Sequence, residues 1–555
     1  MLQGSKWSPR VWLRLALAIW ISVALDDAHL KDSAASSCTQ DGTCQLGSIA
    51  ASDDRPHFWP TGRGVPGRLL TSPFVAPGIN ASSLAWSWHH PDGKYHAVIV
   101  GGPRLDDKGN IYLTLDQGVR KFSPDGQVLW YWEIPVMKEL FFWGTSLMGG
   151  ALYGFADSTP KDSKLGGTAY AISLDTGSLL WERKLKSSCW SNAFVDAHKG
   201  IVLIGSGRAE YHANAIASIL ALNASDGSTL WEFTAEYATW TLAPNFPGDN
   251  TFLFMDVGGG VSRVGLDDGK LIWYKPGEGD DRMTHANGGS NLGPGGDILY
   301  TCSVVNKFES EMEGYQGRQR GLLRAYQVSD GMKLWELDVQ IGCVGFPTIS
   351  PDGSYGVVPL GFNPRMAPQA EWTDQVPRWV QKVIYKMSEI LGLTAKSVPW
   401  SIQEWLIKSG YLEPSFPYAY STPMKTNLLA FNPKTGRMMW ELRPPPYEPL
   451  ASLGDVEGYF VRLDKGNVSG AHATRDKCQS LPWSVPVLDA TGTVYVGHIN
   501  GQIYAVKDSN NDGLINPGGE VSSFDTSGSF LHSGPALAPG MMAIASCDTM
   551  FVFKS

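Results

Sequence analysis

Six tryptophans end near-identical phrases, each four residues after a glycine, and these phrases organise the chain. Successive tryptophans of this set are 51, 50, 42, 62 and 105 residues apart. Self-similarity at a period of roughly 20–50 residues is the signature of a repeat architecture. The phrases are PDGQVLW, DTGSLLW, SDGSTLW, DDGKLIW, SDGMKLW and KTGRMMW, which end at Trp130, Trp181, Trp231, Trp273, Trp335 and Trp440.

Each repeat contains short apolar runs separated by tight turns. Asp-Gly and Thr-Gly pairs between apolar runs are strong local signals for β-hairpins. The seventh repeat shows three strand-like runs, SVPVLD, TVYVGH and QIYAVK, and the tryptophan-bearing repeats add a fourth, as in SLLWERKL. Four antiparallel strands repeated radially make the blades of a β-propeller. The sequence therefore predicts an all-β fold.

The repeats predict eight blades. A seventh repeat lies at 481–526, with Phe524 where the tryptophan strand is expected, and the C-terminal segment supplies three further strands. We expect the missing strand of the last blade in SLAWSW, which contains Trp86 and Trp88. Pairing of this N-terminal strand with the C-terminal strands would close the ring and leave no free edge.

The phrase Ala-x-[Asx]-x-x-Thr-Gly-x-x-x-Trp resembles the repeat of the pyrroloquinoline-quinone (PQQ) propellers, and the resemblance covers about residues 83–555. It implies an eight-bladed PQQ-like propeller whose tryptophans pack between neighbouring blades. The family includes quinoprotein alcohol dehydrogenases and the non-enzymatic outer-membrane assembly propeller of bacteria. This chain resembles the assembly propeller more closely, because it has no adjacent cysteines and no match to the acidic base and metal ligands of the enzymes. The resemblance therefore argues against bound PQQ and leaves any other cofactor open.

The N-terminus has the composition of a secretory signal. Basic residues at 6, 10 and 14 precede the apolar stretch LALAIWISVAL. This stretch is about half of the roughly 20 residues that span a bilayer, so we assign 1–24 to a signal peptide, with a retained anchor as the alternative. We expect 25–80 to be a polar, partly disordered segment and 81–555 to be the propeller.

Cysteines and sequons agree with export. Cys38 and Cys44 bracket a polar segment, SCTQDGTC, which predicts a small disulfide loop. The pairing of the other five cysteines is left open: Cys189, Cys302, Cys343, Cys478 and Cys547. N-x-S sequons predict glycosylation at Asn80, Asn223 and Asn467. We expect a glycoprotein that is secreted or lies in the lumen of the secretory pathway.

Long insertions fall between the second and third strands of a blade, or between consecutive blades. Both kinds of connection lie on one face of a propeller, which we call the long-loop face, whereas the tight turns lie on the other, the short-turn face. The largest insertion, about 365–420, has helical spacing at Val380, Ile384, Met387 and Leu391. We expect this insertion to form a lid, a partner site or a membrane-touching element; the alternative is that its apolar side packs on the rim of the propeller. The other insertions are 158–167, 206–215, 275–291, 305–321 and 444–480.

A calcium-like loop, DSNNDGLINPGGE, follows the third strand of the seventh repeat. Asp508, Asn510 and Asp512 stand at positions one, three and five, followed by Gly513, as in loops that wrap oxygen ligands around Ca²⁺. Glu520 comes one position later than an EF-hand requires. The alternative is an Asx-rich turn that needs no metal. A bound ion would be structural.

Composition and motifs limit the functions. A net charge of −9 without a basic stripe argues against nucleic-acid binding. The cysteines and histidines show no zinc-like spacing, and no nucleophile phrase occurs. We expect a non-catalytic propeller that binds a protein or a small ligand through its long-loop face; the alternative is a PQQ-dependent oxidoreductase. Polar and aromatic residues expected near the channel mouth are Trp190, Trp240, His285, Asn287, Asn291 and His532.

Overall fold

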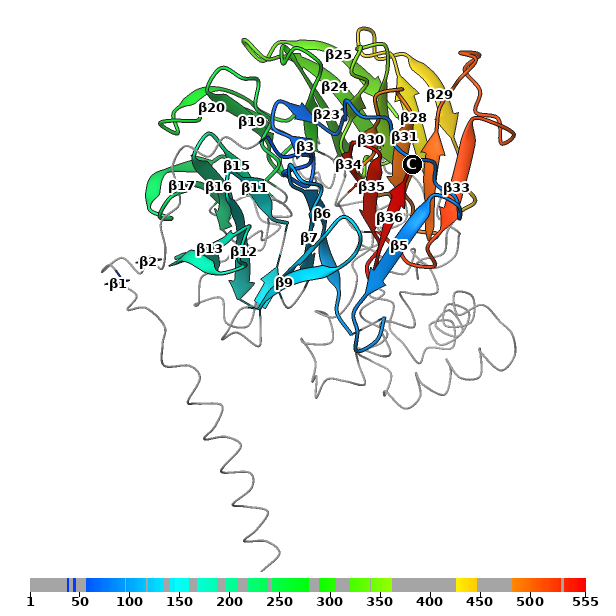
Figure 1. Cartoon of the computed structure of the whole chain (residues 1–555). Coiled ribbons are helices and arrows are strands. Elements are labelled where there is room, and N and C mark those ends of the chain that lie inside the picture. The colour runs from blue at the N-terminus through cyan, green and yellow to red at the C-terminus, as the bar shows by residue number, and fades with distance from the viewer. Residues whose placement is uncertain are drawn as a thin grey trace, which may run out of the picture.

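Short antiparallel strands form eight sheets around a ring, and a small two-stranded ribbon lies near its centre (Figure 1). The computed structural model describes residues 37–38, 43–45, 56–94, 96–115, 118–133, 140–142, 144–158, 167–186, 195–207, 217–237, 239, 242–278, 289–305, 320–339, 341–361, 426–446, 482–530 and 534–555. The predicted signal peptide and the predicted helical insertion at about 365–420 lie outside these residues.

Each of the first four blades runs from an inner strand near the axis of the ring to an outer strand. Blade 1 contains β6 (Ile99–Leu105), β7 (Ile111–Leu115), β8 (Gly118–Phe122) and β9 (Val128–Glu133). Blade 2 contains β11 (Ser146–Met148), β12 (Ala151–Ser158), β13 (Thr168–Ser173) and β14 (Leu179–Lys184), with β10 (Leu140–Phe142) also pairing with β12. Blade 3 contains β15 (Asp196–His198), β16 (Ile201–Gly207), β17 (Ala217–Asn223) and β18 (Thr229–Ala235). Blade 4 contains β19 (Thr251–Met255), β20 (Val261–Gly265) and β21 (Leu271–Lys275), and Asn245 bridges to Leu253 at its inner edge.

The other four blades follow the same order. Blade 5 contains β22 (Ser290–Leu292), β23 (Ile298–Val305), β24 (Arg320–Gln327) and β25 (Lys333–Asp338). Blade 6 contains β26 (Thr348–Ile349), β27 (Gly356–Leu360), β28 (Asn427–Phe431) and β29 (Met438–Leu442). Blade 7 contains β30 (Val487–Leu488), β31 (Val494–Gly497), β32 (Gln502–Val506) and β33 (Val521–Asp525). Blade 8 contains β34 (Ala536–Ala538), β35 (Met541–Ala545), β36 (Thr549–Lys554) and β5 (Leu84–His89).

The ring closes through its two ends. β5 pairs antiparallel with β36, so the N-terminal strand completes the blade built by the C-terminal strands (Figure 1). Phe524 on β33 contacts Phe551 and Phe553 of blade 8, with ring centroids 5.8 and 5.1 Å away. The predicted all-β propeller of eight blades and its closure near Trp86 are confirmed. No described segment contains a helix long and apolar enough to cross a membrane.

The repeated tryptophans lie between adjacent blades. The indole N–H groups of five of them donate to a backbone carbonyl in the tight turn of the next blade, which satisfies the polar atom of a largely apolar side chain. The donor–acceptor distances are 3.0 Å for Trp130 to Leu174, 2.9 Å for Trp181 to Ala224, 2.9 Å for Trp231 to Leu266, 3.1 Å for Trp273 to Val328 and 2.9 Å for Trp335 to Pro433. Trp440 packs with residues of blade 7.

The glycine of each phrase packs against the indole ring of the tryptophan from the preceding blade. At Gly227, φ is +72° and an added Cβ would lie 2.7 Å from the ring of Trp181. Gly177 stands in the same relation to Trp130, and Gly269 to Trp231. Glycine is therefore required by both backbone conformation and close approach. The spacing Gly-x-x-x-Trp joins two different contacts, one with the preceding blade and one with the following blade.

Two N-terminal elements add to the ring. The hairpin of β1 (Ser37–Cys38) and β2 (Thr43–Gln45) extends blade 2, because β2 pairs with the outer strand β14. The ribbon of β3 (Gly64–Val65) and β4 (Arg68–Leu69) lies among the inner strands (Figure 1). The sequence predicts that 25–80 is polar and partly disordered. Part of this segment, within 56–80, packs against the propeller.

Candidate functional site

Residues 56–76 cover one end of the central channel. Trp59 exchanges two 3.0 Å backbone hydrogen bonds with Leu105 on the inner strand of blade 1, and Leu147 of blade 2 donates to the Pro60 carbonyl at 2.8 Å. Leu488 of blade 7 donates to the Leu70 carbonyl at 3.0 Å. These partners all lie close to the turn that follows an inner strand. The segment therefore covers the short-turn end of the channel.

A charged cluster is buried beneath this segment. The Arg63 guanidinium donates to the Pro244 carbonyl at 2.5 Å, and its Nη2 lies 3.7 Å from Oδ2 of Asp196 on β15. Burial lowers the pKa of Arg104 on β6 to about 10, and the Asp196 carboxylate opposes that shift. Burial also raises the pKa of Asp196, opposed by both guanidinium groups. Because a buried charge is tolerated only when paired, the cluster attaches the N-terminal segment to blade 3.

Asn291 is the only predicted channel-mouth residue within the described part of the chain. It lies on β22 and is 1% exposed, and its side-chain amide has no hydrogen-bond partner among the described residues. Its neighbour Ser290 accepts a 2.9 Å hydrogen bond from Asn245. The other predicted residues lie outside the described ranges: Trp190, Trp240, His285, Asn287 and His532.

Asp256 is a buried carboxyl in the turn between β19 and β20. Burial raises the pKa of Asp256 to about 7, although its Oδ1 accepts hydrogen bonds from the Gly258 and Gly260 amides at 2.8 and 2.9 Å. A folded-state pKa above the unfolded value means that the folded protein binds the extra proton. The protonated Asp256 carboxyl therefore stabilises the folded state. This contribution is complete below about pH 4 and is lost as the pH rises through about 7.

We predict that Asp256→Asn flattens the pH dependence of the free energy of unfolding between about pH 4 and 7, by on the order of 4 kcal/mol across that range. The amide keeps an oxygen for the two glycine N–H groups but cannot ionise. Urea titrations at several pH values measure the effect. Asp330→Asn, in an exposed turn of blade 5, serves as the control and keeps the slope of the native protein. Equal slopes in both variants would contradict the prediction.

The predicted calcium loop joins β32 to β33 on the short-turn face. Ligand oxygens of Asp508, Asp512 and Glu520 lie within 4.8 Å of one another. Asn510 bonds to Asp512 through both its amide oxygen, which accepts from the Asp512 N–H at 2.9 Å, and its amide nitrogen. Backbone N–H groups, that of Asn516 first, hold the pKa of Glu520 below its usual range. The loop thus collects carboxylate and amide oxygens of the kind that Ca²⁺ prefers.

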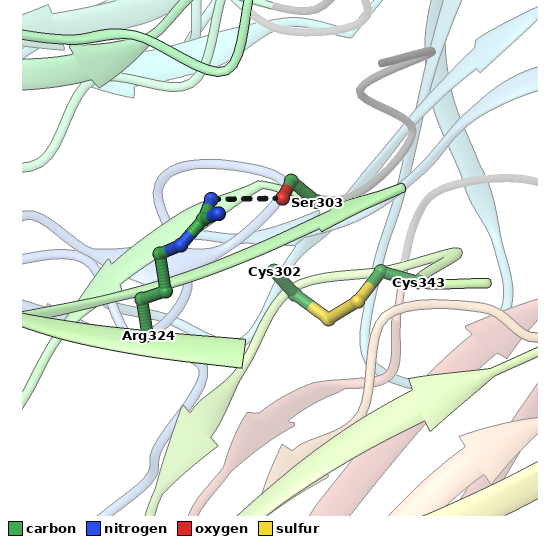
Figure 2. The surroundings of a disulfide bond; sticks show 4 residues. All are labelled: Cys302, Ser303, Arg324 and Cys343. Carbon is green, nitrogen blue, oxygen red and sulfur yellow. Dashed lines mark hydrogen bonds between the residues drawn. A yellow bond between two sulfur atoms is a disulfide. The ribbon is translucent and has the colours of Figure 1, made fainter. Parts of the chain in front are cut away.

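Cys302 and Cys343 form a disulfide that joins blades 5 and 6 (Figure 2). Cys302 is on β23, and Cys343 precedes β26 and bridges to Leu360. Beside this disulfide, Arg324 donates to Ser303 at 3.2 Å (Figure 2). Cys547 is also disulfide-bonded. Cys38 and Cys44 are backbone partners across the β1–β2 hairpin, a separation compatible with the predicted disulfide.

Two of the three predicted sequons are described. Asn80 is exposed, and its Oδ1 accepts a 2.6 Å hydrogen bond from the Ser82 hydroxyl. Asn223 is half-buried, and its Oδ1 accepts from Ser225 at 2.8 Å. Asn467 lies outside the described residues. Asn80 is therefore the more accessible acceptor.

The chain is similar to known propellers. Residues 115–291 match the model of a family described as "Outer membrane protein assembly factor BamB". The structure of BamB from Moraxella catarrhalis is 13% identical, covers 85% of this chain and 99% of its own, and has a TM-score of 0.48. Quinohemoprotein alcohol dehydrogenase from Comamonas testosteroni is 13% identical, with a TM-score of 0.54 over 91% of this chain and 81% of its own. A quinohemoprotein alcohol dehydrogenase from Pseudomonas putida HK5 is 11% identical, with a TM-score of 0.50 over 92% of this chain and 82% of its own.

The family match and the two quinohemoprotein structures confirm the resemblance to PQQ-like propellers that the repeats indicate. At such identities the structural matches show a common fold and carry no activity to this chain. No curated protein sequence matches this chain.

Two groups of residues could not be identified from the sequence. One is the contact of 56–76 with the channel, which has no repeat or periodicity to reveal it. The other is a cluster of His90, Asp92 and His96 in the connection that follows β5. The phrase HHPDGKYH is the only sequence signal for the second, and its spacing matches no common zinc motif.

Proposed function

We propose that this chain is a non-catalytic propeller that binds a protein or a small ligand through its long-loop face, in the lumen of the secretory pathway or after secretion. The observation that carries the proposal is the cover formed by 56–76. This segment occupies the short-turn end of the channel and is held there by Trp59, Leu70 and Arg63, which are 0–1% exposed. The opposite end of the ring is the end from which all six long insertions extend.

The strand order supports this choice of face. The connections from β12 to β13, β16 to β17, β23 to β24 and β27 to β28 each join a second strand to a third strand, and those from β21 to β22 and β29 to β30 join blades. All six leave the ring at one end. Rigid blades that present long loops at one end are a common arrangement for recognition. The match of 115–291 to an assembly-factor family also supports a scaffold.

An absorbance scan tests the proposal against its alternative, a PQQ-dependent oxidoreductase. The purified chain is mixed with PQQ and Ca²⁺, desalted and scanned, and then assayed for dye-linked oxidation of alcohols and sugars. We expect no stoichiometric quinone band and no oxidation. A stoichiometric band together with turnover would refute the scaffold.

Disulfides and the exposed Asn80 support the proposed compartment, because disulfides persist in oxidising environments. We predict that Asn80→Gln removes one N-glycan from protein expressed through a secretory pathway. The variant should migrate faster than the native chain, and glycosidase treatment should abolish this difference. Ser87→Ala, at an exposed position on β5 outside any sequon, is the control and leaves migration unchanged. An identical pattern for Asn80→Gln and the native chain would show that Asn80 is not glycosylated.

We further propose that the 508–520 loop binds Ca²⁺ as a structural ion. A ligand that binds only the folded state stabilises it, by about 2.7 kcal/mol at a hundredfold excess over Kd. We therefore predict a higher thermal midpoint in Ca²⁺ than in EGTA, and loss of this difference in Asp512→Asn. Asp525→Asn, an exposed carboxylate at the end of β33, keeps the calcium effect. The same midpoint in Ca²⁺ and EGTA for the native chain would rule out the ion.

A further inference from the structure

Two histidines and an aspartate converge in the connection between blades 8 and 1. His90, Asp92 and His96 lie between β5 and β6, and one donor atom from each lies within 4.8 Å of the other two. Asp92 Oδ2 is 3.8 Å from His90 Nδ1 and 3.8 Å from His96 Nε2. We propose that these three side chains form a binding site for a divalent transition-metal ion of the Zn²⁺ or Co²⁺ type. This connection joins two blades, so the site lies on the long-loop face.

Two of the three donor–donor separations, those that involve Asp92, are close to the separations found in a metal site. Zinc binds nitrogen and oxygen ligands at 2.0–2.2 Å, which places tetrahedral ligands about 3.4 Å apart. The observed 3.8 Å separations therefore need to shorten by only a few tenths of an ångström. The rings of His90 and His96 are stacked, with centroids 4.3 Å apart, so one ring must turn to aim its nitrogen at the ion. The side chains of His96 and Asp92 are 29% and 70% exposed and can turn without disturbing the core.

The backbone of this connection is held in place. The Gly93 N–H donates to the His90 carbonyl at 3.0 Å, and the His96 N–H donates to the Gly93 carbonyl at 2.9 Å. Farther along, Ile99 donates to the Cys547 carbonyl at 2.8 Å, which ties the connection to blade 8. The His90 side chain is only 8% exposed. His90 Nδ1 accepts a 3.2 Å hydrogen bond from the Asp92 N–H, which a bound ion would replace. The ring of His90 is thus already positioned and the other two ligands are adjustable, which lowers the entropy lost when the ion binds.

The donor set selects the class of metal. Two imidazoles and a carboxylate suit Zn²⁺, Co²⁺ and related ions, whereas Ca²⁺ prefers oxygen ligands alone. Three protein ligands leave a coordination position for water or for a side chain of a bound partner. The site is therefore chemically distinct from the 508–520 loop, and the two lie on opposite faces. The proposed histidine–aspartate metal site does not depend on the proposed scaffold role.

Two cations and one further carboxylate surround the site. Lys94 lies 3.9 Å from Asp548 Oδ1. Nη2 of Arg120 lies 3.3 Å from His90 Nε2, and its guanidinium is stacked 4.0 Å from the ring centre of Tyr131. Metal binding through His90 Nδ1 puts a proton on Nε2, which a guanidinium cannot accept. A metal-bound histidine usually donates this proton to an oxygen. Arg120 therefore weakens the site, and a glutamine there would strengthen it.

Cobalt absorption on the full, untagged chain tests the site. Co²⁺ is titrated in excess Ca²⁺, which saturates the oxygen-only loop, and Zn²⁺ is then added to displace it. We expect one Co²⁺ per chain with visible d–d bands that Zn²⁺ abolishes. Binding should weaken roughly tenfold or more in His96→Ala and Asp92→Asn.

Matched variants separate the site from other histidines. His89→Ala, the exposed neighbour of His90 on β5, should bind Co²⁺ as the native chain does. Arg120→Gln should bind more tightly; equal or weaker binding would overturn the assignment of His90 Nδ1 as a ligand. Circular dichroism confirms that each variant is folded. The proposal fails if the native chain shows no saturable binding, or if His96→Ala binds as tightly as the native chain.

Discussion

Trp181→Ala is expected to lower the free energy of unfolding by about 3–5 kcal/mol, the range for truncating a buried aromatic side chain. Trp181 is fully buried between blades 2 and 3, where its indole donates to the Ala224 carbonyl and covers Gly227. Truncation leaves a cavity between the blades and removes the donor from a buried carbonyl. Equilibrium denaturation in urea measures the loss.

The control for this prediction is the neighbouring repeat. Leu230, which directly precedes Trp231, is 46% exposed, so Leu230→Ala should change stability by no more than about 0.5 kcal/mol. If Trp181→Ala were as mild as Leu230→Ala, the tryptophans would not hold neighbouring blades together. The half-buried Trp273 should give an intermediate value on truncation.

Removing the Cys302–Cys343 disulfide is expected to cost about 4 kcal/mol in the chain-entropy model, which scales with the logarithm of the loop length. The two cysteines are 41 residues apart in sequence and are 0% and 1% exposed. The bond restrains the unfolded chain and joins two blades in the folded one. The double variant Cys302→Ala/Cys343→Ala is compared with the native chain by urea denaturation under oxidising conditions.

Oxidising conditions keep the other disulfides intact, so the double variant isolates this bond. Its midpoint should not respond to a reductant as strongly as that of the native chain does, because one of the reducible bonds is already absent. A double variant as stable as the native chain would contradict the prediction. It would show that contacts between blades 5 and 6 already restrain the same loop.

The ring could be predicted from sequence because its contacts repeat and its signals are local. Every Gly-x-x-x-Trp phrase contains a turn, a strand and a packing residue within seven positions, so six copies reinforce one another. Closure through Trp86 followed from counting strands. The separate contacts of the glycine and the tryptophan in each phrase could not be predicted from the sequence, because the two residues contact different blades.

Contacts that occur once in the molecule could not be predicted. Arg63 looks like an ordinary solvated charge in the sequence, and only the ring brings Asp196 and the Pro244 carbonyl to it. The Cys302–Cys343 pairing depends on two blades lying side by side, which spacing alone does not indicate. In contrast, the acidic side chains of the 508–520 loop are close in sequence, so their convergence could be predicted from their spacing.

The two faces of the ring divide its proposed roles. The short-turn face contains the cover of 56–76 and the candidate calcium loop, to which we assign structural roles. The long-loop face contains the insertions and the cluster of His90, Asp92 and His96. A partner that binds there would meet the long connections and the coordination position that the proposed metal site leaves open.

Comparative affinity purification tests the binding role of the long-loop face most directly. Proteins that copurify from the secretory pathway are quantified for three chains: the native chain, a chain with 365–420 replaced by a short Gly-Ser linker, and Lys434→Glu. Lys434 is exposed in a turn of the same blade on the opposite face. We predict a partner that the native chain and Lys434→Glu retain and the linker chain loses. Identical partners for all three chains would contradict the account.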